Sequence, residues 1–429
     1  MTLSPLEPWI ARKIGSGEAL SRDALANWQL GRLRETIELA RSRSPFYRER
    51  LAGCAPVSSL SDIARLPLTT SGDLRSDPQR FVCVSQSEIS RIVTLPTSGT
   101  TGSPKRLYFT AADIELTLDF FAAGMSTFTG RGDRVLILLP GETPDSVGDL
   151  LCRSLVRIGA AGVKHGPVRD AAETLALARR ERITVMVGIP TQVLELAACS
   201  GGRNFPPVHS VLLTADYVPE AIMRAVERAW SCKTYNHYGM TETGLGGGVD
   251  CAARRGYHLR EADVYYEIID PGTGSPLPEG ERGEIVVTTL TRSGMPLLRY
   301  RTGDYSRWLP GGCPCGTVLR TMEHVRGRAG QAIALGGGLA VTLADLDDIL
   351  FALDGLLDYR ATVGRCGDAR RLGIRFRAAP GSPACQSGAI RAALGRFIKD
   401  GSLVLGSVEP RDRPWTSGGA AKRTLQVEI

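Results

Sequence analysis

The sequence lacks both a long hydrophobic run and a recognisable leader. No stretch reaches the roughly 18 consecutive apolar residues that a membrane-spanning helix needs. The first residues, MTLSPLEPWIARKIG, do not have the charged-then-apolar order of a secretory signal. We therefore expect a cytoplasmic location and no membrane partner.

Long runs of one charge are also missing. The 429 residues carry 52 Lys and Arg against 45 Asp and Glu, a formal net charge of +7, and the basic residues are scattered in short pairs. Scattered positive charge does not form the basic stripe that nucleic-acid binding needs, so we expect no nucleic-acid partner. The charge balance is compatible with an anionic small ligand.

Internal repeats and long low-complexity tracts are absent as well. With 43% hydrophobic residues, a chain of this length can form two or three domains of about 100–200 residues each. The ten cysteines are expected to stay reduced in the cytoplasm. Closely spaced cysteines are therefore better candidates for metal ligands than for disulfides.

Short apolar runs alternate with helical patterns from about residue 91 to residue 287. The runs RVLILLP, ITVMVGIP and HSVLLTA are typical of buried strands, and AAETLALARRE, TQVLELAAC and PEAIMRAVERAW are typical of helices. The alternation predicts an α/β fold with a largely parallel sheet covered on both faces. Ligands of such sheets bind at the carboxyl ends of the strands.

Three other regions have a different pattern. The segment from Ser21 to Leu51 predicts helices that Pro45 interrupts, and VYYEIID to GEIVVTTL predicts an antiparallel, barrel-like portion. After GRAGQ (residues 327–331), a helix, paired strands, a helix and a last strand predict a small α+β unit. We therefore predict two domains, 1–327 and 328–429.

One polar loop stands out, in the segment TLPTSGTTGSPKRLYFT (residues 94–110). Its glycines allow backbone amides to face an anion, and its hydroxyls and Lys105 can bind phosphate oxygens. The segment is not a Walker loop, because Gly102 and Lys105 are separated by Ser103 and Pro104. From these residues alone, a triphosphate cradle and a solvated polar loop both stay open.

Four further segments follow this loop in order: YNHYGMTE (235–242), GERGEIVVTTL (280–290), YRTGD (300–304) and GRAGQ. Together the five segments resemble the signature motifs of the adenylate-forming superfamily of acyl-CoA synthetases. Within it the chain is most similar to the phenylacetate-CoA ligase family, through SPFYRERL, LPLTTSGDLR and CPCG. The resemblance covers nearly the whole chain.

The resemblance implies an ATP-dependent carboxylate-CoA ligase that forms AMP and diphosphate through an acyl-adenylate. The expected partners are ATP, Mg²⁺, coenzyme A and an aromatic or compact carboxylic acid. Residues 1–327 would form the AMP-binding domain and residues 328–429 a mobile lid, and a homodimer stays open. Two alternatives also stay open: transfer of the acyl group to a carrier protein or an amine, and a nucleotide-binding homologue with weak ligase activity.

By position, the resemblance implies a role for each motif residue. Thr241 would contact the α-phosphate, Glu242 would bind Mg²⁺, and Asp304 would accept hydrogen bonds from the ribose. The structural alternatives are a core position for Tyr238, a turn for Asp304 and a helix start for Thr241 and Glu242. The residues expected to hold the nucleotide and its phosphates are Thr97, Ser98, Gly99, Thr100, Thr101, Gly102, Lys105, Tyr238, Gly239, Asp304 and Arg328.

Cys251, His258, Cys313 and Cys315 form a Cys₃His set, and Zn²⁺ prefers thiolates and imidazole. Some members of the resembled family carry zinc at equivalent positions. Four protein ligands close the coordination sphere, so we expect a structural zinc. The alternative is two packed cysteines in a glycine-rich turn and a surface histidine.

The sequence departs from the family pattern in three places. Gly330 and Gln331 stand where relatives usually have acids at the hinge, and Asp216 stands where they usually have glutamate. Near the end the chain reads TSGGAAKRTL, so the family's bridging lysine falls on a glycine or alanine and Lys422 comes two or three residues late. We predict a catalytic role for Lys422 if it reaches the site, and a surface position otherwise.

Overall fold

The computed structural model of the chain describes all residues except 1, 18, 96–103, 202–204, 206, 329–331, 337–338, 367–368, 380–381, 383–385, 396–402, 412–422, 424 and 428–429. Its residues divide into two compact units by their contacts. Unit 1 comprises residues 1–130, 153–158 and 236–325, and unit 2 comprises residues 131–152, 159–235 and 326–429. The predicted domain boundary near residue 328 stays a prediction.

Unit 1 begins with the predicted helices. Ser21 caps the helix α2 (Arg22–Arg43) by accepting a 3.1 Å hydrogen bond from the backbone N–H of Ala24. The helix ends before Pro45, which opens α3 (Pro45–Arg50) in the first-turn position that proline tolerates. The predicted interruption at Pro45 is therefore confirmed.

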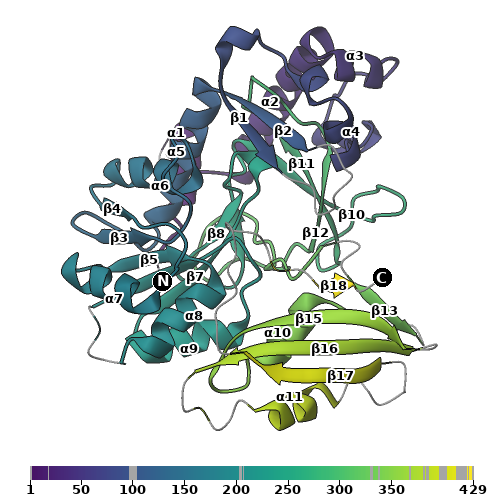
Figure 1. The fold of residues 1–429 in the computed structure, drawn as a ribbon. Coiled ribbons are helices and arrows are strands. Elements are labelled where there is room, and N and C mark those ends of the chain that lie inside the picture. The colour runs from purple at the N-terminus through teal and green to yellow at the C-terminus, as the bar shows by residue number, and fades with distance from the viewer. Residues whose placement is uncertain are drawn as a thin grey trace. The chain divides into compact units, whose positions relative to one another are not determined.

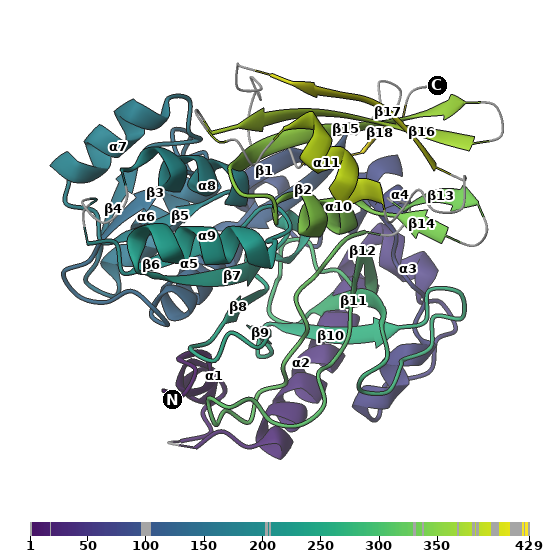
Figure 2. The same cartoon turned by 90° about the horizontal axis from the view of Figure 1, so that it is seen from below.

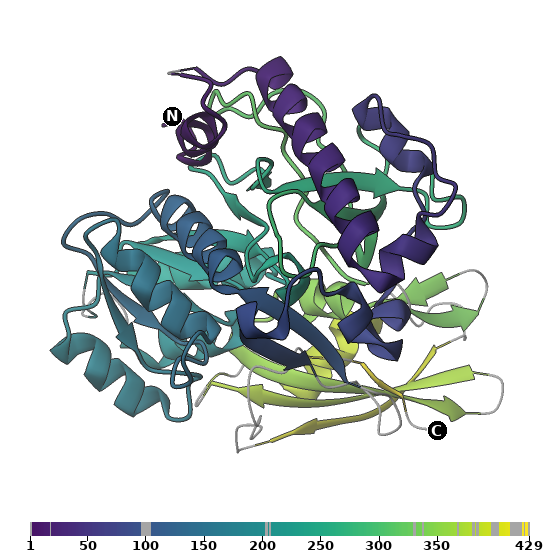
Figure 3. The ribbon, with the colours of Figure 1, turned by 90° about the horizontal axis from the view of Figure 1, so that it is seen from above.

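Helix α2 packs along the strands of unit 1 (Figure 3). The indole N–H of Trp28 donates to the carbonyl of Ala262 at 2.9 Å, and the hydroxyl of Thr36 donates to the carbonyl of Leu290 at 3.0 Å. These bonds join two successive parts of the helix to the segments that flank β10 (Val264–Ile269) and β11 (Gly283–Thr289).

The strands of unit 1 are antiparallel. β10, β11 and β12 (Tyr300–Ser306) form a three-stranded sheet in that order, so the antiparallel character predicted for this stretch is confirmed. The predicted parallel region, however, begins too early. β1 (Ile89–Leu95) and β2 (Lys105–Thr110) form their own antiparallel pair, in which Leu95 lies opposite Lys105. Apolar periodicity predicts strands but does not reveal their partners.

The remaining elements of unit 1 lie between these segments. They are α1 (Leu6–Ile14), η1 (Leu60–Arg65), α4 (Ser71–Ser76), η2 (Pro78–Phe81), η3 (Gln86–Glu88), α5 (Ala111–Met125), η5 (Thr241–Thr243), β8 (Gly248–Asp250) and β9 (Tyr257–Leu259).

Unit 2 contains the parallel strands. β4 (Ala161–Lys164), β3 (Arg134–Ile137), β5 (Val185–Gly188) and β6 (Ser210–Leu213) lie in that order, and each neighbouring pair is parallel. The helices that follow β4, β5 and β6 are the ones that the apolar periodicity predicts (Figure 1). They are α7 (Ala171–Arg180), α8 (Pro190–Cys199) and α9 (Glu220–Trp230). The chain passes between the units within α6 (Val147–Val156) and β7 (Lys233–Tyr238). The predicted α/β class is confirmed.

The C-terminal part of unit 2 adds a second sheet, of order β17-β16-β15-β18. Helices α10 and α11 lie together against it (Figure 2). One continuous apolar core includes Leu136 and Val211 of the parallel strands and Leu346 and Phe376 of this C-terminal part. The elements are β13 (Ile333–Gly336), β14 (Leu339–Val341), α10 (Leu343–Leu350), β15 (Leu356–Cys366), β16 (Ala369–Ala378), α11 (Ser387–Leu394), β17 (Leu403–Pro410) and β18 (Gln426–Val427).

No helix among the described residues combines the length and the apolar character that crossing a bilayer requires. The expected cytoplasmic location stays a prediction.

A buried arginine fastens the N-terminal segment of unit 1 to its antiparallel sheet. The guanidinium of Arg299 pairs with Glu267 at 3.0 Å and donates to the carbonyls of Ala64 and Leu66 at 2.8 and 2.9 Å. The side chains of Arg299 and Glu267 are only 3% and 4% exposed. Burial raises the pKa of the Glu267 carboxyl, and the charge of Arg299 opposes that shift. The pair therefore supports the fold as long as both partners are present.

We expect Arg299→Met to lower the free energy of unfolding by about 3–5 kcal/mol, because it leaves Glu267 buried without a countercharge. Urea unfolding followed by tryptophan fluorescence measures the change. Arg65→Met is the control: Arg65 pairs with Asp62 at 3.2 Å but is 75% exposed, so its loss should cost less than about 1 kcal/mol. Equal midpoints for the two variants would contradict the role of Arg299.

Candidate active site

Three side chains from distant parts of unit 1 meet in a buried polar cluster. Lys105 at the start of β2 forms an ion pair with Glu242 of η5. The ammonium of Lys105 also donates to the hydroxyl of Tyr300 at 3.0 Å, and that hydroxyl donates to Oε1 of Glu242 at 3.0 Å. Each polar group of this cluster therefore has a partner inside it.

The cluster keeps the carboxyl of Glu242 ionised. Burial alone would raise its pKa, but the charge of Lys105 and the hydrogen bonds from Lys105 and Tyr300 outweigh burial and hold the pKa below its usual value. The side chains of Lys105 and Glu242 are 13% and 6% exposed. A buried carboxylate that stays charged at neutral pH suits a hard cation such as Mg²⁺.

The backbone that carries Glu242 is fixed by tight turns. A Cβ on Gly239 would lie 2.1 Å from the carbonyl oxygen of Leu245, so only glycine fits this position. The backbone N–H of Leu245 donates to the carbonyl of Met240 at 2.8 Å, which closes the turn around Glu242. Gly244 ends the short helix with a positive φ of 78°.

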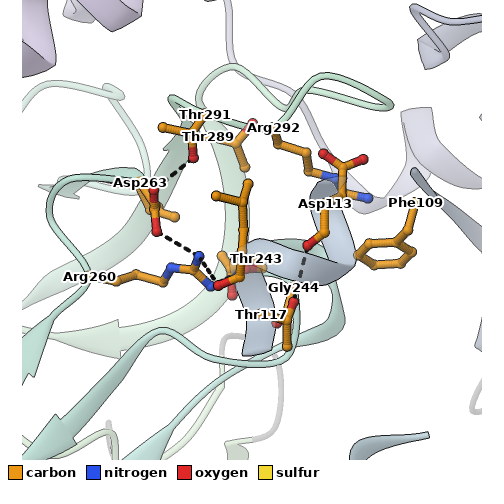
Figure 4. A pocket seen from close by; sticks show the side chains of 12 residues that line it. Phe109, Asp113, Thr117, Thr243, Gly244, Arg260, Asp263, Thr289, Thr291 and Arg292 are labelled. Carbon is orange, nitrogen blue, oxygen red and sulfur yellow. Dashed lines mark hydrogen bonds and ion pairs between the residues drawn. The ribbon is translucent and has the colours of Figure 1, made fainter. Parts of the chain in front are cut away.

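Buried arginines support this turn from behind, in a small pocket that Figure 4 shows. Arg292 donates to the carbonyl of Glu242 at 2.9 Å and to the carbonyl of Tyr108 at 2.8 Å, and its guanidinium lies over the ring of Phe109. Arg260 forms a 2.7 Å ion pair with Asp263 in the same pocket. These interactions make the pocket a support for the Glu242 turn. The pocket is lined by Phe109, Asp113, Leu116, Thr117, Thr243, Gly244, Arg260, Asp263, Val264, Thr289, Thr291 and Arg292.

A second buried pair joins Tyr238, the last residue of β7, to Asp304 of β12. The phenol donates to Oδ2 of Asp304 at 3.0 Å, and the two residues are 6% and 3% exposed. Burial and the neighbouring carboxylate raise the pKa of the Tyr238 phenol well above its usual value, so the tyrosine stays neutral. The backbone N–H of Asp304 donates to the hydroxyl of Thr302, which fixes the acid in its strand.

The predicted metal-binding residues lie together elsewhere in unit 1. The ligand atoms of Cys251, His258, Cys313 and Cys315 are all within 4.8 Å of one another, and all four residues are buried. Sγ of Cys251 lies 3.5 Å from Sγ of Cys313, and Sγ of Cys315 lies 3.4 Å from Nε2 of His258. Nδ1 of His258 faces the carbonyl of Arg320 at 3.2 Å, a partner that leaves Nε2 available as a ligand.

The structure thus brings several of the predicted residues together and leaves others undescribed. Lys105 meets Glu242, Tyr238 meets Asp304, and Thr241 opens the short helix that carries Glu242. Arg328 is half-buried and belongs to unit 2. The predicted phosphate-loop residues Thr97, Ser98, Gly99, Thr100, Thr101 and Gly102, the hinge residues Gly330 and Gln331, and the predicted catalytic Lys422 lie outside the described residues.

Tyr300 and Arg292 are the members of the site that the sequence reasoning missed. The signal for Tyr300 was present in YRTGD, since Tyr300, Thr302 and Asp304 occupy every second position and share the buried side of β12. A tyrosine in a strand is usually a packing residue, however, which hides its hydrogen bonds. The partners of Arg292 are backbone carbonyls, which no residue pattern reveals.

Comparisons with known proteins agree with the ordered motifs. The family model described as "AMP-binding enzyme" matches residues 49–291. Phenylacetate-coenzyme A ligase of Thermus thermophilus is 28% identical, with 96% of this chain and 98% of the relative covered. The phenylacetate-coenzyme A ligase of Pseudomonas putida is 30% identical, with 75% of this chain and 74% of the relative covered.

Solved structures extend the likeness to the fold. A 2-hydroxyisobutyryl-CoA ligase, solved in the postadenylation state in complex with 2-HIB-AMP, matches with a TM-score of 0.78 at 22% sequence identity. The match covers 95% of this chain and 89% of that structure.

We expect Tyr300→Phe to weaken the binding of ATP with Mg²⁺ by about tenfold. The change removes the phenol's hydrogen bonds to Lys105 and Glu242 and leaves their ion pair less firmly placed. We expect the net effect on binding to equal about one hydrogen bond to a charged group, or about 1.5 kcal/mol. Titration calorimetry with ATP and MgCl₂ measures the effect. Tyr305→Phe, on the less buried side of the same strand, is the control and should bind like the parent. Unchanged binding in Tyr300→Phe would show that the cluster does not need the phenol.

Proposed function

The chain belongs to the family of AMP-binding enzymes and is related to phenylacetate-CoA ligases along most of its length, and on this basis we propose that it is an ATP-dependent acyl-CoA ligase. It joins a carboxylic acid to coenzyme A through an acyl-adenylate. The observation that carries the proposal is the buried Lys105–Tyr300–Glu242 cluster, a cation and an ionised carboxylate on the motifs that the family uses for nucleotide binding.

The reaction takes place in two steps. In the first, a carboxylate oxygen attacks the α-phosphorus of ATP, the bond to the bridging oxygen breaks and diphosphate leaves. In the second, the sulfur of coenzyme A attacks the acyl carbon, AMP leaves and the thiol proton passes to solvent. Catalysis of the first step depends mainly on positioning the two anions and balancing their charge.

We assign the nucleotide contacts by their place in the motifs. Lys105 and the loop Thr97–Gly102 hold the β- and γ-phosphates, and Thr241 contacts the α-phosphate. Tyr238 and Gly239 flank the adenine, and Asp304 binds the ribose. Arg328, in the motif GRAGQ, lies close to the ribose as well. Glu242 binds Mg²⁺, which supplies positive charge to the phosphate oxygens. Lys422 completes the proposed catalytic set, and residues 328–429 act as the mobile lid.

The proposed acid is aromatic or compact. The relatives with the widest coverage are named for phenylacetate, and the structural neighbour is named for 2-hydroxyisobutyrate. Both acids are small, and one of them is aromatic. The alternative is that a carrier protein or an amine accepts the acyl group in place of coenzyme A. The pyrophosphate and thioester assay described next distinguishes these outcomes.

We expect pyrophosphate release that requires ATP, Mg²⁺ and a carboxylic acid, and a thioester only when coenzyme A is added. A panel of aromatic and short branched acids identifies the substrate. Glu242→Gln should lower the rate about 10²–10³-fold, as for loss of one group that stabilises transition-state charge. Glu35→Gln, an exposed change on α2, is the control. ATP binding without pyrophosphate from any acid would overturn the proposal.

We further propose that Cys251, His258, Cys313 and Cys315 hold a structural zinc ion. Zinc–sulfur bonds of about 2.3 Å place neighbouring sulfurs about 3.8 Å apart in a tetrahedron, close to the 3.5 Å between Cys251 and Cys313. The backbone N–H of Ala253 donates to Sγ of Cys251 at 3.4 Å, which suits a sulfur that carries negative charge. The ion would supply no chemistry to the reaction and would crosslink the turn after β8 to residues 313–315.

Elemental analysis of protein purified without chelator should give one zinc per chain. Cys313→Ser should lose the metal and lower the melting temperature by several degrees, since a lost crosslink of about 1 kcal/mol already shifts it by about 2–4 °C in a domain of this size. Cys232→Ser, a buried cysteine outside the set, should keep the zinc. A parent protein free of zinc, or a Cys313→Ser variant that retains it, would contradict this site.

A further inference from the structure

An arginine near the chain end connects two distant parts of unit 2. Nε of Arg423 donates to Oδ2 of Asp216 at 3.0 Å. Its two terminal nitrogens donate to the two carboxylate oxygens of Asp347, at 2.9 and 2.8 Å. One guanidinium therefore joins the segment after β6 to helix α10 through three hydrogen bonds, a planar geometry that lysine cannot reproduce.

The contact between Arg423 and Asp216 lies at the edge of the parallel strands where ligands bind. Asp216 lies three residues beyond the last residue of β6, at the carboxyl end of a parallel strand. This end of an α/β sheet is the edge where ligands bind, and we call it the ligand edge. Ala215 before it has a positive φ of 72°, a conformation that non-glycine residues adopt rarely. The strand end is thus held in a sharp turn that points Asp216 toward Arg423.

The surroundings of Arg423 are built to hold it. Its guanidinium lies 5.3 Å from the ring centroid of Phe351 and 5.6 Å from that of Tyr359. The Tyr359 hydroxyl donates to Asp347 at 2.6 Å, and the side chain of Asp347 is 1% exposed. Burial alone would lower the pKa of Arg423, but Asp347 and Asp216 together raise it well above its usual value. Arg423 therefore stays charged, with its orientation fixed by two carboxylates and two rings.

A second contact joins the segment after β6 to helix α10, and we call this pair of contacts the junction. The hydroxyl of Tyr217, next to Asp216, donates to Asp348, next to Asp347, at 2.8 Å. Arg326 pairs with Asp348 at 2.5 Å and lies over the ring of Tyr217. Two consecutive residues at the ligand edge are thus linked to two consecutive acids of α10, Tyr217 directly and Asp216 through Arg423.

We propose that Arg423 is a positioning residue for adenylate formation: by joining Asp216 to Asp347, it fixes the C-terminal segment of unit 2 against the ligand edge of the parallel strands. The proposal rests on the proposed ligase function. Without Arg423, the hydrogen bonds that link Asp216 to Asp347 are lost and the junction opens.

Charge explains why the first half-reaction should be the sensitive one. Adenylate formation brings together two anions, the carboxylate and ATP. Asp216, left without its countercharge, adds negative charge at the ligand edge, where the enzyme must balance it. The second half-reaction joins a thiol to an adenylate that is already formed, and two of the phosphate groups have left. It therefore depends less on this junction.

The test separates the half-reactions. In Arg423→Gln, we expect the kcat of carboxylate-dependent pyrophosphate release to fall by about tenfold or more, with little change in the KM for ATP. Thioester formation from the supplied acyl-adenylate and coenzyme A should stay within about threefold of the parent. Arg423→Lys keeps the charge but cannot span both carboxylates, so it should recover only part of the loss.

Arg377→Gln is the matched control. Arg377 of β16 forms a bidentate pair with Glu195 in the middle of α8, with both distances 2.6 Å. It joins the same two parts of unit 2 through a helix and not through the segment after β6. It should leave both half-reactions near the parent values. Equal losses in both half-reactions for Arg423→Gln, losses matched by Arg377→Gln, or full recovery in Arg423→Lys would overturn the proposal.

Hydrogen exchange tests the junction without any activity. Arg423→Gln should speed amide exchange in α10 and at Asp216–Tyr217, and Arg377→Gln should not. Unchanged exchange in these segments would overturn the proposal even in an active enzyme. Absence of pyrophosphate from the parent would instead count against the ligase function, while the exchange result still decides whether Arg423 positions the junction.

Discussion

Buried guanidinium groups are the constraint on which unit 1 depends, because an arginine in a protein interior keeps its charge and needs partners for most of its N–H groups. Arg292 ties the turn of Glu242 to β2, and Arg260 ties the following residues to Asp263 and to the carbonyl of Leu116 in α5. Arg299 ties the N-terminal segment to the antiparallel sheet. These arginines fix the backbone around the nucleotide motifs.

This arrangement explains how a carboxylate and an ammonium can share a buried cluster. Glu242 and Lys105 come from motifs 137 residues apart, and Tyr300 bridges them from a third. Their side chains can meet only if each backbone is already in place, since a flexible turn would let the charged groups move toward solvent. The fixed turn at Gly239 and the contact of Arg292 with the Glu242 carbonyl provide that rigidity.

Much of the fold and part of the candidate site could be predicted from the sequence. The physical reasons for these successes also explain what the sequence could not predict. Periodicity reports which face of an element is buried, so the helices around Pro45 and the strands β3, β5 and β6 were predicted correctly. It does not report which strands pair, so the antiparallel β1–β2 pair was assigned to the parallel region. Motif order predicted the residues of the Lys105–Glu242 cluster. Tyr300 and Arg292 were missed because their roles depend on groups that become neighbours only after folding.

The contact of Asp216 with Arg423 links two features that look independent in the sequence. The resemblance to the family predicts a glutamate at position 216 and a lysine at position 419 or 420, a few residues before Arg423. The separation of Asp216 from Arg423 by 207 residues hides the pairing, but in unit 2 a single hydrogen bond of 3.0 Å joins them. Aspartate is one methylene shorter than glutamate, so the cation that meets it must reach further toward the strand end. An arginine that also holds both oxygens of Asp347 has that reach and a fixed direction. Asp216 and Arg423 are therefore parts of one junction at the ligand edge, and a change in either alone would leave a buried charge without its partner.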